Sequence, residues 1–326
     1  VPARIALMTG MDAIKNGVLD NGQTLRPDHR ACGIETWPEI LTDAAGNGGG
    51  YSTVAVGKMH FYPWEARWGF RQRIIAEDKI WINVEDDYYH FLRAHGFRKT
   101  IGHERPEFHS QFMTYLSDIP WELSVDHFVG QEAARWIREY QGEGPFAMMV
   151  GFPGPHSPYD PTPEYAARFA PEAMPEPVPM NEADAQRSSR KGGWPSRTWY
   201  AYNHDRRPTR DDYMLQRAYY AALVKQIDDA VGTILETLRE TGALDNTVIL
   251  FSSDHGDYLG DHRLTGKNSF YESATRVPLL ARLPAAAGKT CYPGLAALSD
   301  VTATILALAG CEAPAHVDSI PLPGLG

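Results

Sequence analysis

Cationic, imidazole and carboxylate side chains follow three separate apolar segments of this chain. The segments span residues 51–56, 146–152 and 248–251, and each has the apolar, β-branched character of a buried strand. The side chains that follow them are Lys58 and His60, then His156, and then Asp254 and His255, with Lys267 shortly behind. Because ligands of open α/β sheets bind where the carboxyl ends of the strands meet, we expect these groups to share one pocket. An acid and an imidazole beside lysines suggest an anion held against a metal ion.

Two further features suit chemistry on an anion. His156 lies in the turn PGPHSPY, whose prolines stiffen the backbone around the imidazole, although a rigid loop histidine with no chemical role is the alternative. The opening residues VPARIALMTG predict a short helix that begins at Pro2 and stops at Gly10, with Arg4 in its first turn. The amino terminus of a helix attracts anions, because its N–H groups are free and its dipole is positive there.

The rest of the pattern predicts the elements that carry these groups. Helices are expected at residues 36–45, 85–93, 123–140, 211–241 and 300–310, and residues 277–283 read as an edge strand because they contain Pro278. We therefore expect an α/β fold with a mostly parallel central sheet and helices on both faces, forming one domain over residues 1–326. Residues 161–210 read as a long excursion over the surface, whose aromatic residues either line a substrate cleft or anchor the loop.

Bulk properties exclude several classes of function. The formal charge of −10 argues against general affinity for nucleic acid or an anionic membrane, so an anionic substrate would need a local positive pocket. Three dispersed cysteines do not build a disulfide framework or a zinc cluster. No apolar run approaches the ~18 to 20 residues that span a bilayer. The chain begins at Val1 without a methionine, so the lack of a signal peptide leaves a cytoplasmic or periplasmic location open.

The motifs around these residues resemble those of the sulfatases, a family of the alkaline phosphatase superfamily. Residues 50–60, GYSTVAVGKMH, match every fixed position of the family pattern Gly-Tyr-x-Thr-x-x-x-Gly-Lys-x-His. Residues 1–4, VPAR, with the later Thr9-Gly10, fit the signature that follows the sulfatase nucleophile. SDHGDYLGDHRLTGK and YESATRVPLL resemble the metal-and-lysine motif, and residues 155–158 resemble the family's Pro-His-x-Pro turn.

The resemblance implies a cofactor and a role for each residue. It places a cysteine oxidised to formylglycine immediately before Val1 and a pair of metal-binding aspartates on an earlier strand. One divalent metal would be bound by Asp254 and His255. Calcium is the usual ion of the family, and manganese, magnesium or zinc also suit the imidazole, which stands where many members have asparagine. By the same resemblance, Arg4 and Lys58 hold the nucleophile, His156 and Lys267 assist the leaving group, and His60 takes the proton that lets the sulfated intermediate collapse.

These expectations amount to hydrolysis of a small-molecule or saccharide sulfate ester, with the oligomeric state left open. The first alternative is a phosphonate monoester or phosphodiester hydrolase of the same superfamily, although Lys58 and His60 favour a sulfatase because the phosphonate-cleaving branch differs there. A two-zinc enzyme would need more ligands, and we interpret the second Asp-His pair, Asp261 and His262, as a loop feature. The second alternative is an inactive fragment that keeps only an anion pocket.

Overall fold

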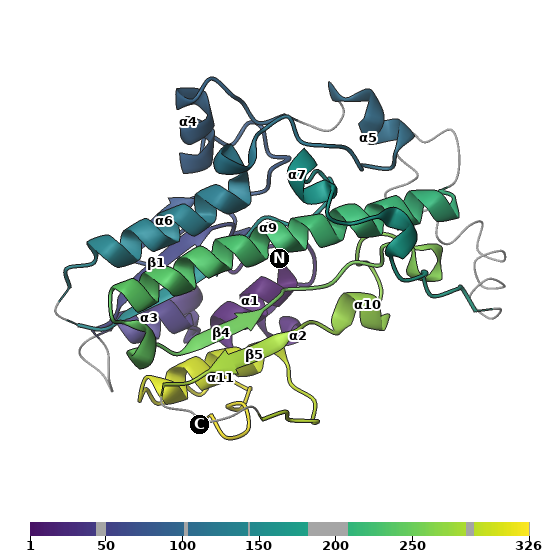
Figure 1. Cartoon of the computed structure of the whole chain (residues 1–326). Helices are drawn as coiled ribbons and strands as arrows, with labels where there is room; N and C mark the ends of the chain where they lie inside the picture. Colours follow the sequence, from purple (N-terminus) through teal and green to yellow (C-terminus); the bar gives the residue numbers. More distant parts are fainter. Residues whose placement is uncertain (44–49, 101–103, 143, 182–207, 285–289, 326) are drawn as a thin grey trace.

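Two small β-sheets and two layers of helices make up the computed structural model (Figure 1), which describes the chain apart from residues 44–49, 101–103, 143, 182–207, 285–289 and 326. In the first sheet, β1 (Ser52–Gly57) lies between β2 (Gln72–Ile75) and β3 (Phe146–Gly151), and both pairings are parallel. In the second sheet, β4 (Ile249–Ser252) pairs with β5 (Leu279–Arg282) in antiparallel fashion. The three strands expected from the apolar segments are therefore present, and β5 is an edge strand as Pro278 predicts.

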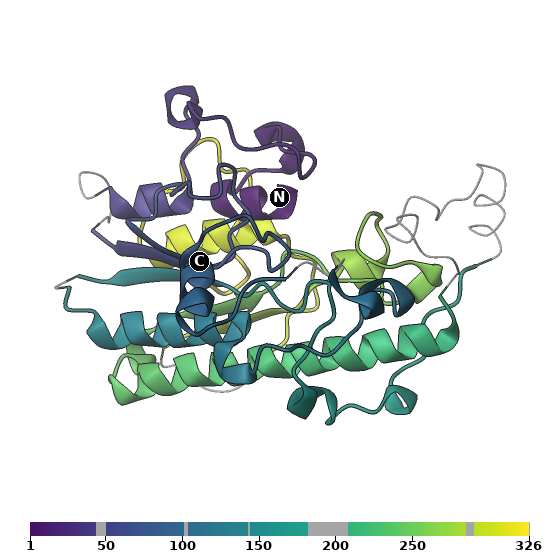
Figure 2. The same ribbon diagram turned by 90° about the horizontal axis from the view of Figure 1, so that it is seen from above.

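Helices cover both faces of the first sheet (Figure 2). In the part of the chain that the structure describes, the α-helices are α1 (Pro2–Thr9), α2 (Ala13–Asn16), α3 (Trp37–Thr42), α4 (Asp87–Ala94), α5 (Pro106–Ser110), α6 (Val125–Glu139), α7 (Pro163–Ala166), α9 (Arg210–Glu240), α10 (Glu272–Thr275) and α11 (Leu298–Leu308). Short 3-10 turns occur at His29–Cys32, Trp121–Leu123, Pro171–Ala173, Leu244–Asn246 and Asp261–Arg263. The expected fold class, a parallel sheet in a mixed α/β arrangement, is confirmed.

The side chains of β1 point alternately to the two faces of the first sheet, and each face is covered by a layer of helices. Ala55 faces one hydrophobic core together with side chains of α1, α3 and α11, whereas Val54 and Val56 face a second core with side chains of α4 and α6. Successive side chains of a strand point to opposite faces, so a strand that is apolar at every position is buried on both. The long helix α9 packs beyond α6 in the second layer (Figures 1 and 2).

The helix boundaries follow from local chemistry. The side chains of Thr36 and Glu39 form a capping box at the start of α3, and Gly10 ends α1 with a left-handed φ of 68°. A capping box between Thr209 and Asp212 starts α9. These ends lie within a few residues of those expected from the sequence.

Gly57 sets the exit of β1 toward the candidate site. Its φ is 90°, and a Cβ at this position would lie 2.2 Å from the carbonyl oxygen of Gly151. Only glycine accepts this conformation without strain, and the close approach lets the backbone N–H of Lys58 donate to that same carbonyl at 2.7 Å. β1 and β3 therefore deliver their final residues side by side.

The described part of the expected surface excursion crosses the outside of α9. The hydroxyl of Tyr165 in α7 donates to Asp229 at 2.8 Å, and Arg210 is ion-paired with Glu176. Residues 182–207, which carry Trp194, Trp199, Tyr200, Tyr202 and His204, lie outside the described residues, so their two interpretations stay predictions.

None of the helices in the described residues is long and apolar enough to cross a membrane.

Candidate active site

Arg4 connects the first helix to two of the strand ends. Its Nε donates to Oδ2 of Asp254 at 2.7 Å, and its Nη1 donates to the carbonyl oxygen of Lys58 at 2.8 Å. Burial alone would raise the pKa of Asp254, but the Arg4 guanidinium outweighs it and holds the pKa of that carboxyl well below its usual range. The amino end of α1, the end of β1 and the end of β4 thus meet at one point, although β4 does not belong to the same sheet as β1.

His156 and Lys267 form the second contact of the cluster. Nζ of Lys267 lies 2.8 Å from Nε2 of His156, while Nδ1 of the same ring lies 2.8 Å from the carbonyl oxygen of Ser157. An ammonium only donates and a carbonyl only accepts, so both contacts require a neutral ring with its proton on Nδ1. Burial lowers the pKa of His156 to about 3, and burial and then the Lys58 ammonium lower the pKa of Lys267.

Lys58 is held by Asp78, a residue that was not predicted from the sequence. Its ammonium donates to Oδ2 of Asp78 at 2.7 Å, and both side chains are about 5% exposed or less. Burial opposes ionisation of Asp78, but Lys58 and His156 outweigh it and keep the pKa of that carboxyl well below its usual range. Oδ2 of Asp78 also lies 4.0 Å from Nδ1 of His156, so this carboxylate borders both groups.

His60 borders the same charges, in a strained backbone conformation. Its φ is 58°, and Glu77 accepts hydrogen bonds from the backbone N–H groups of Met59 at 3.1 Å and of His60 at 3.0 Å. Burial lowers the pKa of His60 to about 3, and Lys58 contributes next. The imidazole is therefore neutral at pH 7, and it packs edge-on against Trp81 with a ring separation of 5.1 Å.

Asp254 and His255 offer two acceptor atoms to a cation. Nδ1 of His255 donates to the carbonyl oxygen of Gly256 at 2.9 Å, so its Nε2 carries the lone pair, and burial lowers the pKa of the ring to about 4. This Nε2 lies 3.7 Å from Oδ1 of Asp254. An ionised oxygen and an unprotonated nitrogen that face each other without a proton between them fit the donor set of a divalent metal.

These two residues do not complete a metal site. Within the described residues, no group of three or more His, Cys, Asp or Glu side chains lies close enough to hold an ion. The second Asp-His pair does not add ligands: Asp261 accepts from the backbone N–H of Val178 at 2.8 Å and from Ser273 Oγ at 2.5 Å, and it is ion-paired with Arg217. This agrees with the interpretation of that pair as a loop feature.

Glu77 and Asp78 were not predicted as site residues, because β2, the strand that they follow, was not recognised in the sequence. That strand has only four residues, two of them polar, Gln72 and Arg73. The available signal was a pair of acids directly after the short apolar run of residues 74–76, which is the same pattern that exposed the other strand ends.

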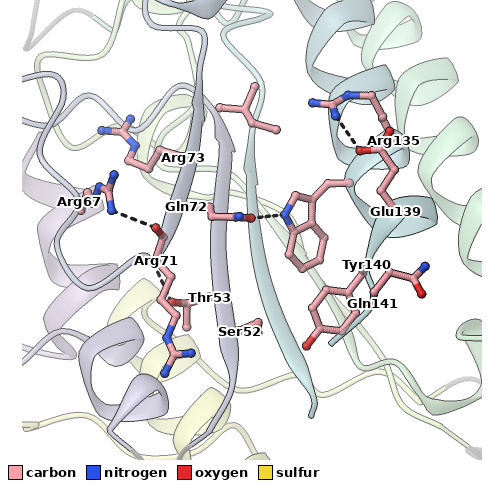
Figure 3. A pocket seen from close by; sticks show the side chains of 12 residues that line it. Ser52, Thr53, Arg67, Arg71, Gln72, Arg73, Arg135, Glu139, Tyr140 and Gln141 are labelled. Atoms are coloured by element: carbon pink, nitrogen blue, oxygen red, sulfur yellow. Dashed lines mark hydrogen bonds and ion pairs between the residues drawn. The ribbon is translucent and has the colours of Figure 1, made fainter. Parts of the chain in front are cut away.

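A hollow of about 610 Å³ lies at the opposite ends of the strands (Figure 3). It is lined by Ser52 and Gln72 at the starts of β1 and β2 and by Trp136 and Tyr140 from the end of α6, and Trp136 Nε1 donates to the side-chain oxygen of Gln72 at 2.5 Å. None of the converging charged residues lines it. The candidate site is therefore the cluster at the carboxyl ends of β1 and β3, where ligands of α/β sheets bind.

Comparisons with known proteins give the same motifs a context. The family model described as sulfatase matches residues 1–311. The arylsulfatase of Clostridium perfringens is 28% identical over 303 residues, which cover 85% of this chain and 60% of the relative. The choline-sulfatase of Rhizobium meliloti is 28% identical over 332 residues, or 95% of this chain and 58% of the relative. The chain thus spans about 60% of the length of these two relatives. The phosphonate monoester hydrolase of Agrobacterium radiobacter shares the fold, with a TM-score of 0.77, 22% identity, and coverage of 99% of this chain and 67% of that one.

Proposed function

This chain belongs to the sulfatase family, and from that premise we propose that it carries the site at which a sulfuric ester is hydrolysed. The observation that carries the proposal is the convergence of Arg4, Lys58, His156, Asp254 and Lys267, which come from four segments far apart in sequence. A sulfate monoester needs positive charge for its nonbridging oxygens and a proton for its leaving oxygen, and this set offers both.

The charges suit an anion of this shape. Arg4 uses Nε and Nη1 for Asp254 and the Lys58 carbonyl, which leaves Nη2 to donate to a sulfate oxygen. Burial, and after it the Lys58 ammonium, lower the pKa of Lys267, so the two ammonium groups repel each other in part. An anion bound between the two ammonium groups would relieve that repulsion. The site would therefore attract a sulfate, although the net charge of the chain is negative.

His156 and Lys267 would act on the leaving group. The proton is held at Nζ of Lys267, whose pKa is lowered by burial and by Lys58, and a lowered pKa makes the ammonium a better acid at neutral pH. Nε2 of His156 accepts from that ammonium and orients it. The imidazole of His60 is neutral and would take up a proton in the second half of the reaction, although burial, Lys58 and Arg4 lower its pKa and so oppose that step.

The metal and the nucleophile are the finer parts of the proposal. Asp254 Oδ1 and His255 Nε2 would bind one divalent cation, calcium first and manganese or magnesium next, together with the pair of aspartates that the family resemblance places upstream of Val1. The cation would neutralise charge on the sulfate oxygens. The position for a formylglycine immediately before Val1 is supported by the geometry of α1, which begins at Pro2 and carries Arg4 in its first turn. Arg4 contacts both Asp254 and the Lys58 carbonyl, so the residue before Val1 would lie close to these groups.

The substrate class remains the one expected from the motifs. We propose a sulfate monoester of a small alcohol, a phenol or a saccharide, and the names of the choline-sulfatase and the arylsulfatase are in line with the first two. The proposal concerns the whole protein, of which this chain supplies the charged cluster.

The test compares two substrates that differ in the reacting atom. The full-length protein is assayed with 4-nitrophenyl sulfate and with 4-nitrophenyl phenylphosphonate, with and without calcium. Faster turnover of the sulfate is expected, because Lys58 and His60 are the residues that favour a sulfatase. Faster turnover of the phosphonate would support the first alternative, and no turnover of either, together with thermal stabilisation by inorganic sulfate, would support an inactive anion-binding protein. Mass spectrometry of the peptide that contains Val1 tests for formylglycine independently of activity.

A further inference from the structure

Two consecutive residues after β2 contact the ends of both other strands of the first sheet. Asp78 reaches Lys58 at the end of β1, and Lys79 reaches the turn that follows β3. We propose that Asp78 and Lys79 are positioning residues that fix the distance between Lys58 and His156. This inference rests on the proposed function. It gives the segment after β2 a role in the reaction, although neither Asp78 nor Lys79 would touch the substrate.

Asp78 limits the freedom of the Lys58 ammonium. Its Oδ2 accepts from Nζ of Lys58 at 2.7 Å, and its backbone carbonyl accepts from Trp81 N–H at 2.9 Å, which closes a tight turn behind the carboxylate. A lysine side chain loses about 2 kcal/mol of rotamer entropy when it is ordered, so an exposed ammonium would not stay in one place without such a partner. The buried ion pair with Asp78 therefore fixes the direction in which the other N–H bonds of the Lys58 ammonium point.

Lys79 holds the His156 turn from one side. Its Nζ donates to the carbonyl oxygen of Pro158 at 2.7 Å and is ion-paired with Asp160, and the two side chains are only 12% and 19% exposed. On the other side of the turn, the backbone N–H of Gly154 donates to Oδ1 of the buried Asp126 at 3.0 Å. The turn lies beyond the end of β3, so these side-chain contacts replace the backbone pairing that a strand would supply.

The two contacts act together because one peptide bond joins them. A shift of the segment after β2 would move the partner of Lys58 and the partner of the His156 turn at the same time. Misplacement of a reacting group by about 1 Å can cost on the order of 10²-fold in rate. Since His156 orients the Lys267 ammonium, loss of Lys79 is expected to harm proton delivery to the leaving group more than binding of the sulfate.

The experiment removes the ammonium and keeps the stem. In the full-length enzyme, Lys79→Met is expected to lower kcat about 10²-fold with little change in KM. The loss should be larger for phenyl sulfate than for 4-nitrophenyl sulfate, whose leaving group needs less protonation. Lys225→Met is the control, because Lys225 pairs with Asp228 and Asp229 on α9 and contacts none of the catalytic residues. It should change neither kcat nor the dependence on the leaving group.

A second variant provides the test if Lys79→Met does not fold. Lys79→Met combined with Asp160→Asn removes both charges, so no unpaired carboxylate remains buried, and the bond to the Pro158 carbonyl is still lost. An unchanged ratio of the two substrates in a folded variant would overturn the inference.

A crystal structure of the variant separates this inference from the proposed function. The inference predicts that the contact of 2.8 Å between His156 Nε2 and Lys267 Nζ lengthens beyond hydrogen-bonding distance. If it stays intact, the positioning role is wrong even when the wild type proves to be a sulfatase. If the wild type hydrolyses no sulfate, the proposed function fails, while the geometry still decides the positioning role.

Discussion

Replacement of Lys267 by methionine should separate activity from stability. The change removes the ammonium that donates to His156 Nε2 at 2.8 Å and keeps most of the apolar stem. A positioned general acid contributes about 10²- to 10⁴-fold to a rate. At 1.36 kcal/mol for each factor of ten, this is roughly 2.7 to 5.4 kcal/mol of transition-state stabilisation. We expect a loss in that range for phenyl sulfate, and a loss of about tenfold or less for 4-nitrophenyl sulfate, whose phenol leaves readily without a proton.

The Lys267→Met change should lower activity, but it should not lower the free energy of unfolding at pH 7. Burial and the nearby Lys58 lower the pKa of Lys267 below its ordinary value of 10.5, so the charged lysine disfavours the folded state. The unfolded chain binds this proton more tightly, and the wild type should therefore gain stability as the pH rises through the folded pKa toward 10.5. The Lys267→Met variant should lack that gain and should be at least as stable as the wild type at pH 7.

The assay measures kcat/KM for both substrates in the full-length enzyme, alongside urea unfolding at pH 7 and pH 10. Lys225→Met serves as the control, because Lys225 is a partly exposed lysine on α9 that pairs with Asp228 and Asp229 far along the chain from the cluster. Equal losses of kcat/KM for the two substrates would refute the role of Lys267 as a general acid. A variant that unfolds at a lower urea concentration at pH 7 would refute the claim that the charged lysine destabilises the folded state.

Three further predictions concern the frame of the site. Gly57→Ala should destabilise the protein by more than about 3 kcal/mol in urea unfolding, because its φ is 90° and the new Cβ would meet the Gly151 carbonyl at 2.2 Å; an unchanged midpoint would contradict this. Burial raises the pKa of Asp126 to about 6, so stability should fall as the pH rises from about 4 to 6. In Asp126→Asn that fall, of up to about 3 kcal/mol, should disappear, and chemical denaturation across this pH range checks it. Asp254→Asn should abolish stabilisation by calcium in a thermal shift assay, and a shift equal to that of the wild type would argue against this residue as a ligand.

The strand ends were predictable because they depend on local patterns. Lys58, His156 and Asp254 each follow an apolar run long enough to be recognised as a buried strand, and glycine or proline fixes where two of the runs end. Capping residues and the spacing of apolar side chains likewise defined α3, α6 and α9 within a few residues. These features depend on neighbours within one or two turns of chain, so the sequence alone contains them.

Only the tertiary structure decided how the groups pair. β2 was too short and polar to be recognised, yet it supplies Asp78, the partner of Lys58. The sequence also suggested that Asp254 reaches the site through a shared sheet, whereas β4 pairs with β5 and Arg4 makes the connection. The physical reason is that side-chain pairing depends on distances set by the packing of distant elements, as with Arg4 and Asp254, which are 250 residues apart in sequence. The residue types of this sequence determined which charges the protein holds, and the packing of its helices and sheets determined which of those charges neutralise one another and which remain for a substrate.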